Sequence, residues 1–161
     1  MAHGKLAKGE YFFWNISSDV GVGKPNSLDD VELVRFGFSC WSLWPSDFNA
    51  LKPDFKQAIH ALRWQGGFDQ DLQLVIDLNQ KYYGGKQDRC ISVAKSGIDK
   101  NLEYQKGQYW TIWILNAYMR FGLPSLYPRI DMDSRSGPAI TETVRGSFIS
   151  TSWNAANNPN F

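Results

Sequence analysis

Four segments of the chain carry apolar residues at helical spacing, and glycines or prolines separate them. The first, residues 26–44, places Val31, Val34, Phe38 and Trp41 along one face. The other three have the same pattern and follow in order at residues 53–64, 68–83 and 109–122. Recurrence at three and four residues is typical of amphipathic helices. The last segment is apolar on nearly every side, so we expect it to be central.

Segments near both ends of the chain have the composition of β-strands. Residues 10–16 are aromatic, residues 139–153 alternate Thr and Ser with Ile, and residues 89–94 form a shorter candidate. β-branched and aromatic residues favour strands. We expect the two terminal segments to pair beside the helices. The fold class is then α+β, with a compact helical core and a small antiparallel sheet.

The length and composition predict one domain over residues 1–161, with flexible tails at 1–8 and 154–161. The 17 basic and 16 acidic residues leave a net charge of +1, which gives no reason to expect a nucleic-acid or membrane partner. The unusual feature is the aromatic content, with seven Trp, seven Tyr and ten Phe. Cys40 and Cys90 are predicted to be buried free thiols without a disulfide. The N-terminus lacks the apolar run of a secretory signal, so we expect a soluble cytoplasmic protein, with export by a non-Sec route as the alternative.

A Gly-x-Gly-Lys sequence before the first predicted helix is similar to part of a phosphate-binding loop. Such a loop needs a glycine five residues before the Gly-Lys pair and a hydroxyl residue directly after it. Ser18 and Pro25 stand at these two positions. Proline offers no side-chain oxygen to a metal ion. A nucleotide is therefore not expected, and no cofactor is predicted.

Three short patterns follow in order over about residues 20–118. The first is an Asp-Val pair with apolar residues three and seven positions on, the second is a Gly-x-Phe turn before a helix that ends near a glutamine, and the third is Thr-x-x-x-Leu. The residues that carry them are Asp30, Val31, Val34, Phe38, Gly66, Phe68, Gln80, Thr111 and Leu115. Together they resemble the peptidoglycan-binding-like family of small three-helix domains. The resemblance implies a bacterial module whose fold serves cell-wall binding.

The chain also departs from that family. Gln65 stands where the family has Asp, Asp69 where it has Gly, Leu72 where it has Thr, and Asn79 where it has Phe. Insertions at 42–53 and 86–107 lengthen the connections. The shared positions mostly build the scaffold, so any glycan site must come from other residues.

Aromatic side chains close to predicted helix ends are the candidates for that site. Sugars stack their apolar C–H faces on Trp and Tyr, while amides and carboxylates fix the hydroxyl groups. We predict a ligand-binding role for Trp44, Trp64, Asp69, Tyr82 and Tyr83. Trp41 lies on the apolar stripe of the first helix and is assigned to the core.

No convincing catalytic constellation is present in the sequence. The only histidines are His3 and His60, and neither has a compact set of zinc ligands beside it. Cys40 lies inside a predicted helix, which suits packing better than nucleophilic attack. The acids of residues 131–135 lack the further oxygen ligands of an EF-hand. We therefore expect no enzyme and no metal site.

Three function classes stay open. The first is a non-catalytic binding module, for cell-wall peptidoglycan glycan or for a protein partner on the same surface. The second is a cytoplasmic protein–protein interaction or immunity-like protein on an inherited scaffold. The third is a cell-wall hydrolase whose site the sequence does not reveal. We favour binding over catalysis, and the sequence leaves the oligomeric state open.

Overall fold

A computed structural model describes residues 3–7, 11–83, 87–93 and 111–150. Its elements, in chain order, are β1 (His3–Ala7), β2 (Tyr11–Asn15), β3 (Val20–Gly21), α1 (Leu28–Trp41), α2 (Pro45–Phe48), α3 (Pro53–Ala61), α4 (Gln70–Tyr83), β4 (Cys90–Ile91), α5 (Thr111–Gly122), the 3-10 helix η2 (Ile130–Met132) and α6 (Pro138–Ser150). The α+β class with a helical core and a small antiparallel sheet is confirmed. Among the described residues, no helix is both long and apolar enough to cross a membrane.

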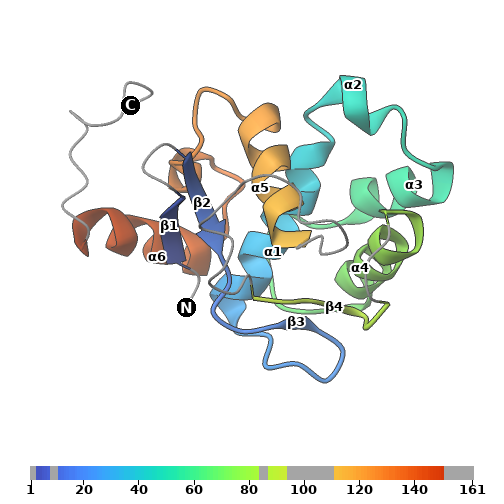
Figure 1. Cartoon of the computed structure of the whole chain (residues 1–161), viewed down its shortest axis with the longest axis horizontal. Helices are drawn as coiled ribbons and strands as arrows, with labels where there is room; N and C mark the ends of the chain where they lie inside the picture. Colours follow the sequence, from blue (N-terminus) through green and yellow to red (C-terminus); the bar gives the residue numbers. More distant parts are fainter. Residues whose placement is uncertain (1–2, 8–10, 84–86, 94–110, 151–161) are drawn as a thin grey trace.

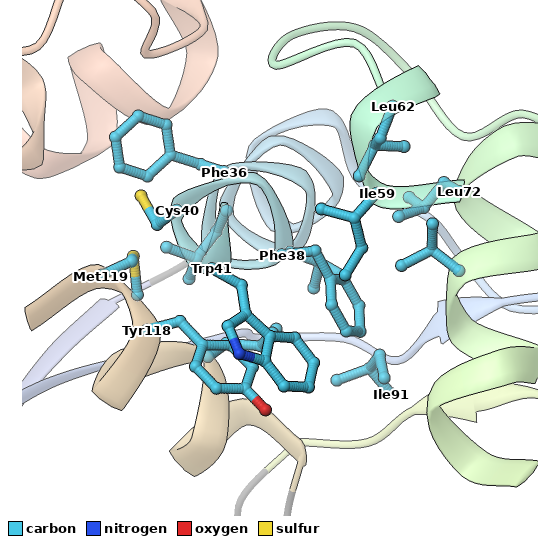
Figure 2. Packing of buried hydrophobic residues seen from close by; sticks show 14 of the residues in the cluster. Phe36, Phe38, Cys40, Trp41, Ile59, Leu62, Leu72, Ile91, Tyr118 and Met119 are labelled. Atoms are coloured by element: carbon cyan, nitrogen blue, oxygen red, sulfur yellow. The ribbon is translucent and has the colours of Figure 1, made fainter. Parts of the chain in front are cut away.

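Helix α1 lies in the middle of the molecule, with α5 and α6 on one side and α3 and α4 on the other (Figure 1). Every α1 residue after Leu28 is buried, including charged ones. Gly37 lets α5 approach closely, since a Cβ there would lie 2.8 Å from Cβ of Leu115. Figure 2 shows Phe38 of α1 beside Ile59, with Leu72 beyond, and Trp41 of α1 beside Tyr118. Helix α5 packs closely against the central helix α1, as expected from its apolar sequence. It is not buried on all sides, because Arg120 and Phe121 face solvent.

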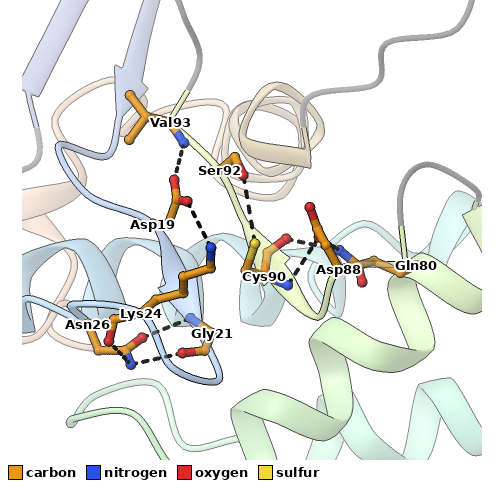
Figure 3. A network of polar contacts seen from close by, with 9 residues as sticks. All are labelled: Asp19, Gly21, Lys24, Asn26, Gln80, Asp88, Cys90, Ser92 and Val93. Atoms are coloured by element: carbon orange, nitrogen blue, oxygen red, sulfur yellow. Dashed lines mark hydrogen bonds and ion pairs between the residues drawn. The ribbon is translucent and has the colours of Figure 1, made fainter.

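The glycine loop between β3 and α1 is closed by its own side chains (Figure 3). Asn26 accepts a hydrogen bond from the Gly21 amide at 2.8 Å and donates to the carbonyls of Gly21 and Lys24, each at 2.9 Å. Gly21 has φ +151° and lies directly against Cys90 where β3 pairs with β4. A side chain at Gly21 would collide with that strand. The glycines thus serve a tight loop.

The buried charges of α1 fasten neighbouring segments to it. The Asp30 carboxylate accepts hydrogen bonds from the hydroxyls of Ser17, Ser18 and Ser27 and from the backbone amides of Ser17 and Ser18. Five donors around one carboxylate satisfy it in place of water. Asp30 therefore fixes the chain between β2 and β3 to the start of α1.

Arg35 performs the same task for the Gly-Gly-Phe turn. Its side chain is 0% exposed, and it donates to the carbonyl of Gly67 from Nε and Nη2 and to the carbonyl of Arg63 from Nη1, at 2.7–3.2 Å. Gly66 has φ +115°, a left-handed conformation that favours glycine. The turn that resembles the family motif thus has a structural task in this chain.

Two expectations about the chain ends are wrong. Residues 3–7 of the predicted N-terminal tail form β1, which pairs antiparallel with β2, with His3 opposite Asn15. This two-stranded sheet is thus built from the N-terminal segment, and β3 and β4 form a second two-stranded sheet. Residues 139–150 form most of α6, whereas we predicted a strand over 139–153; the remainder of that strand and the predicted tail at 154–161 lie outside the described residues.

The physical reason for α6 is a cap and a buried face supplied by α1. The Ile140 amide donates to Oε2 of the buried Glu32 at 3.0 Å, which satisfies a donor that the first helical turn leaves free. Ile140 and Val144, four residues apart, are both buried. Serine and threonine in the same segment gave the misleading strand pattern.

Candidate binding surface

An aromatic cluster gathers around Trp41 at the C-terminal end of α1. The Tyr118 ring from α5 stacks on the Trp41 indole at 3.8 Å between centroids and 16° between planes, as Figure 2 shows. Tyr83 from α4 meets Trp41 edge-on at 5.3 Å, and Phe55 from α3 does so at 5.4 Å. Four helices thus contribute to one cluster. Trp41 itself is buried, as assigned from the sequence.

Asp47 of α2 brings a carboxylate to the rim of this cluster. Its Oδ2 accepts a hydrogen bond from Nε1 of Trp41 at 2.6 Å. Burial, and then the negative charge of Asp47, raises the pKa of the phenols of both Tyr83 and Tyr118. Both phenols therefore stay protonated at neutral pH and keep a hydrogen to donate. The arrangement places the Asp47 carboxylate and the phenol of the exposed Tyr83 beside aromatic rings, whereas Tyr118 is buried.

A second aromatic pair includes Trp44, whose carbonyl accepts a hydrogen bond from the Asp47 backbone amide. The rings of Trp44 and Phe121 stack with centroids 4.6 Å apart and planes at 25°. Trp44 precedes α2, three residues before Asp47, and Phe121 follows Tyr118 by three residues on α5, one helical turn later. The exposed fraction is 53% for Phe121 and 41% for Tyr83. Large exposed aromatics on a folded surface often mark an interaction site.

We name this feature the Asp47 surface and define it by Trp44, Asp47, Tyr83, Tyr118 and Phe121. It contains two of the five residues predicted to bind ligand, Trp44 and Tyr83. Tyr82 lies next to it and packs against Phe55 at 6.3 Å.

The polar end of Tyr82 is already engaged. Its hydroxyl donates to Oδ2 of Asp54 at 2.5 Å, and the Lys81 ammonium lies 4.8 Å above its ring centroid. The hydrogen bond from Tyr82 and the other donors near Asp54 outweigh the effect of desolvation and lower the pKa of this carboxyl. Tyr82 is therefore a less available contact than Tyr83.

Trp64 and Asp69 are held by other neighbours. Trp64 meets Phe36 edge-on at 5.6 Å, and the guanidinium of Arg135 lies 4.3 Å above its ring centroid. Asp69 forms ion pairs with Arg35 at 2.5 Å and with Arg63 at 2.9 Å.

Asp69 also accepts the Leu72 amide at 2.9 Å, which caps the start of α4. Desolvation would raise its pKa, but the amide and the two arginines outweigh that effect and hold the pKa below its usual range. The geometry thus assigns Asp69 a structural task and brings neither it nor Trp64 together with Trp44 or Tyr83.

Groups considered for catalysis or metal binding also have other partners. His60 meets the Phe48 ring edge-on at 4.9 Å. Asp131 pairs with Arg129 at 2.8 Å, and Asp133 pairs with Arg135 at 2.6 Å. Within the described ranges, no group of three or more His, Cys, Asp or Glu side chains could hold a metal ion.

Sequence reasoning missed three members of the Asp47 surface: Asp47, Tyr118 and Phe121. Asp47 was one carboxylate among many, and the other two were part of a helix taken to be central. The available signal was spacing, because Asp47 follows Trp44 by three residues and Phe121 follows Tyr118 by three. The sequence spacing does not show that Trp44 stacks on Phe121, because this contact depends on how the start of α2 packs beside α5.

Comparison with known proteins returned no match to a family model, to a curated protein or to a solved structure. The functional argument therefore depends on the geometry of the chain itself.

Proposed function

We propose that this protein is a non-catalytic binding module that uses the Asp47 surface to hold cell-wall peptidoglycan glycan. One observation carries the proposal: the Asp47 carboxylate binds the Trp41 indole, against which the exposed Tyr83 ring packs, and Asp47 follows by three residues Trp44, whose ring stacks on the exposed Phe121. Flat aromatic faces take the C–H faces of sugars, and a carboxylate accepts hydrogen bonds from hydroxyl groups. The resemblance of residues 20–118 to peptidoglycan-binding-like domains gives independent support for the ligand class.

Co-sedimentation with insoluble peptidoglycan sacculi tests this proposal. We expect the protein to sediment with sacculi and to release no soluble muropeptides. Trp44→Ala and Phe121→Ala each remove half of the stacked pair and should weaken binding about tenfold. Met132→Ala is the matched control, because Met132 is a large exposed hydrophobic residue on η2, outside the Asp47 surface. Thermal melting checks that the variants stay folded.

Each possible result has a distinct meaning. Equal loss in Trp44→Ala and Met132→Ala would count against the Asp47 surface as the contact. Release of muropeptides would favour the hypothesis that the protein is a cell-wall hydrolase. Absence of sedimentation would rule out wall glycan as the ligand and favour a protein partner for the same surface.

A further inference from the structure

The Asp47 carboxylate has no cationic partner among the residues that the structure describes. Elsewhere in the same ranges, arginine balances several carboxylates: Arg35 at Asp69, Arg129 at Asp131 and Arg135 at Asp133. The recorded hydrogen bond to the Asp47 side chain comes from the neutral Trp41 indole and reaches Oδ2. Within the described residues, the negative charge of Asp47 is therefore not balanced by a cation.

The aromatic cluster around Trp41 lies beside this charge. Tyr118 stacks on Trp41, and Tyr83 meets Trp41 edge-on. After burial, the Asp47 charge contributes to the raised pKa of both phenols. The faces of Trp, Tyr and Phe attract cations through their quadrupole, and attraction grows when the cation leaves water. A carboxylate beside such rings adds direct charge attraction. Neutral sugar hydroxyls would leave this charge unbalanced.

We propose that the Asp47 surface recognises an organic ammonium group, with Asp47 as the counter-ion and the faces of Tyr83 and the Trp44–Phe121 pair as its aromatic walls. This inference rests on the proposed function and specifies which part of a wall polymer the surface contacts. A primary ammonium group occurs there on a de-N-acetylated amino sugar or on a free amine of a stem peptide. Both present the same –NH₃⁺ chemistry.

Chemical acetylation of sacculi tests the role of the ammonium group. Acetic anhydride converts free amines to neutral amides, and we expect it to weaken co-sedimentation about tenfold. Asp47→Asn should weaken binding to untreated sacculi to a similar degree and abolish the difference between the two preparations. Asparagine keeps an oxygen for the Trp41 indole, so the local hydrogen bond survives. Asp71→Asn on α4 is the matched control, because Asp71 is an exposed carboxylate outside this surface.

Soluble probes distinguish the two sources of the ammonium group. Titration calorimetry compares a glucosamine oligomer with its N-acetylated form, and a short lysine peptide with its side-chain-acetylated form. Stronger binding of the free-amine sugar assigns the contact to the glycan, and stronger binding of the free-amine peptide assigns it to the stem. In either case Asp47→Asn should remove the preference and Asp71→Asn should keep it.

The outcomes separate this inference from the proposed function. Equal binding of native and acetylated sacculi, with no Asp47 dependence, overturns the ammonium inference and leaves the wall module intact. Asp47-dependent binding of a soluble amine without sedimentation supports the inference and removes peptidoglycan as the ligand. If neither sacculi nor any amine probe binds, both proposals are wrong.

Discussion

Single buried charges on α1 hold separate segments in place. Asp30 binds the serines before β3, Glu32 caps α6, and Arg35 holds the turn before α4. Each would cost several kcal/mol to bury without partners. Each side chain thus joins α1 to a segment outside the helix, and we expect its removal to loosen that segment.

Asp30 gives the sharpest test at this scale, through its pH dependence. Desolvation would raise its pKa, but hydrogen bonds from Ser27, Ser17 and Ser18 outweigh that effect and lower the pKa. A lowered native pKa contributes stability above the unfolded value of about 3.9, and this contribution is lost as the pH falls through the native value. We expect Asp30→Asn to lower the free energy of unfolding by about 2 kcal/mol at pH 7.

Urea unfolding at pH 7 and near pH 3 measures this difference. The gap in unfolding free energy between wild type and Asp30→Asn should narrow at the lower pH, because pH 3 lies below the unfolded-state pKa of about 3.9 and unfolding of the wild type then takes up a proton at Asp30. Asp71→Asn, an exposed substitution, should change stability by less than about 0.5 kcal/mol at both values. A gap that stays constant with pH would show that the charge of Asp30 is not the stabilising feature.

At the scale of elements, α6 depends on α1 for both its cap and its apolar contact. Gly137 lies directly before α6, and a Cβ there would collide with the Glu32 carboxylate that caps the helix. Gly146 lies inside α6, and nothing is within 4 Å of the position that its Cβ would take. Replacement by alanine should therefore have opposite effects on stability at these two positions.

The two Gly→Ala variants test the cap directly. Gly137→Ala forces Glu32 away from the Ile140 amide and should lower the free energy of unfolding by about 1–2 kcal/mol. Gly146→Ala should raise it by about 0.5–1 kcal/mol, because alanine favours the helix and restricts the unfolded chain. Thermal or denaturant unfolding of both proteins gives the comparison. Two shifts of the same sign would contradict this description of α6.

The elements also show how far sequence patterns reach. Apolar spacing predicted the helices observed as α1, α3, α4 and α5, since each carries a recognisable buried face. It failed for α6, whose cap comes from Glu32, more than 100 residues earlier. The same limit applies to the candidate site: Trp44 and Tyr83 were predicted by residue type, but their association with Asp47 and Phe121 depends on packing between helices.

At the scale of the whole molecule, the aromatic residues divide between core and surface around one cluster. Trp41 is enclosed, whereas Tyr83 and Phe121 face solvent on elements that pack against it. The proposed binding surface is therefore built on the packed core. Asp47, Tyr83 and Phe121 lie on helices, so a ligand can contact them without the ordering of a loop among the described residues.

Thiol reactivity reports whether this core stays closed. Cys40 and Cys90 are both free and buried, and burial raises the pKa of each thiol. The thiolate is the reactive form, so we expect slow labelling of both by a disulfide reagent in the native protein at pH 8. Denaturant should release two equivalents of reactive thiol. Rapid labelling of either cysteine without denaturant would contradict the closed structure.

The enclosure of α1 has a consequence for how this protein can change over generations. From Asp29 to Trp41 every residue is buried, and the charged side chains of Asp30, Glu32 and Arg35 are held by groups on other segments. A substitution on α1 must be accompanied by a compensating one elsewhere, whereas the rim of the Asp47 surface is free of that constraint. We expect descendants of this chain to retain the α1 sequence while their ligand preferences diverge.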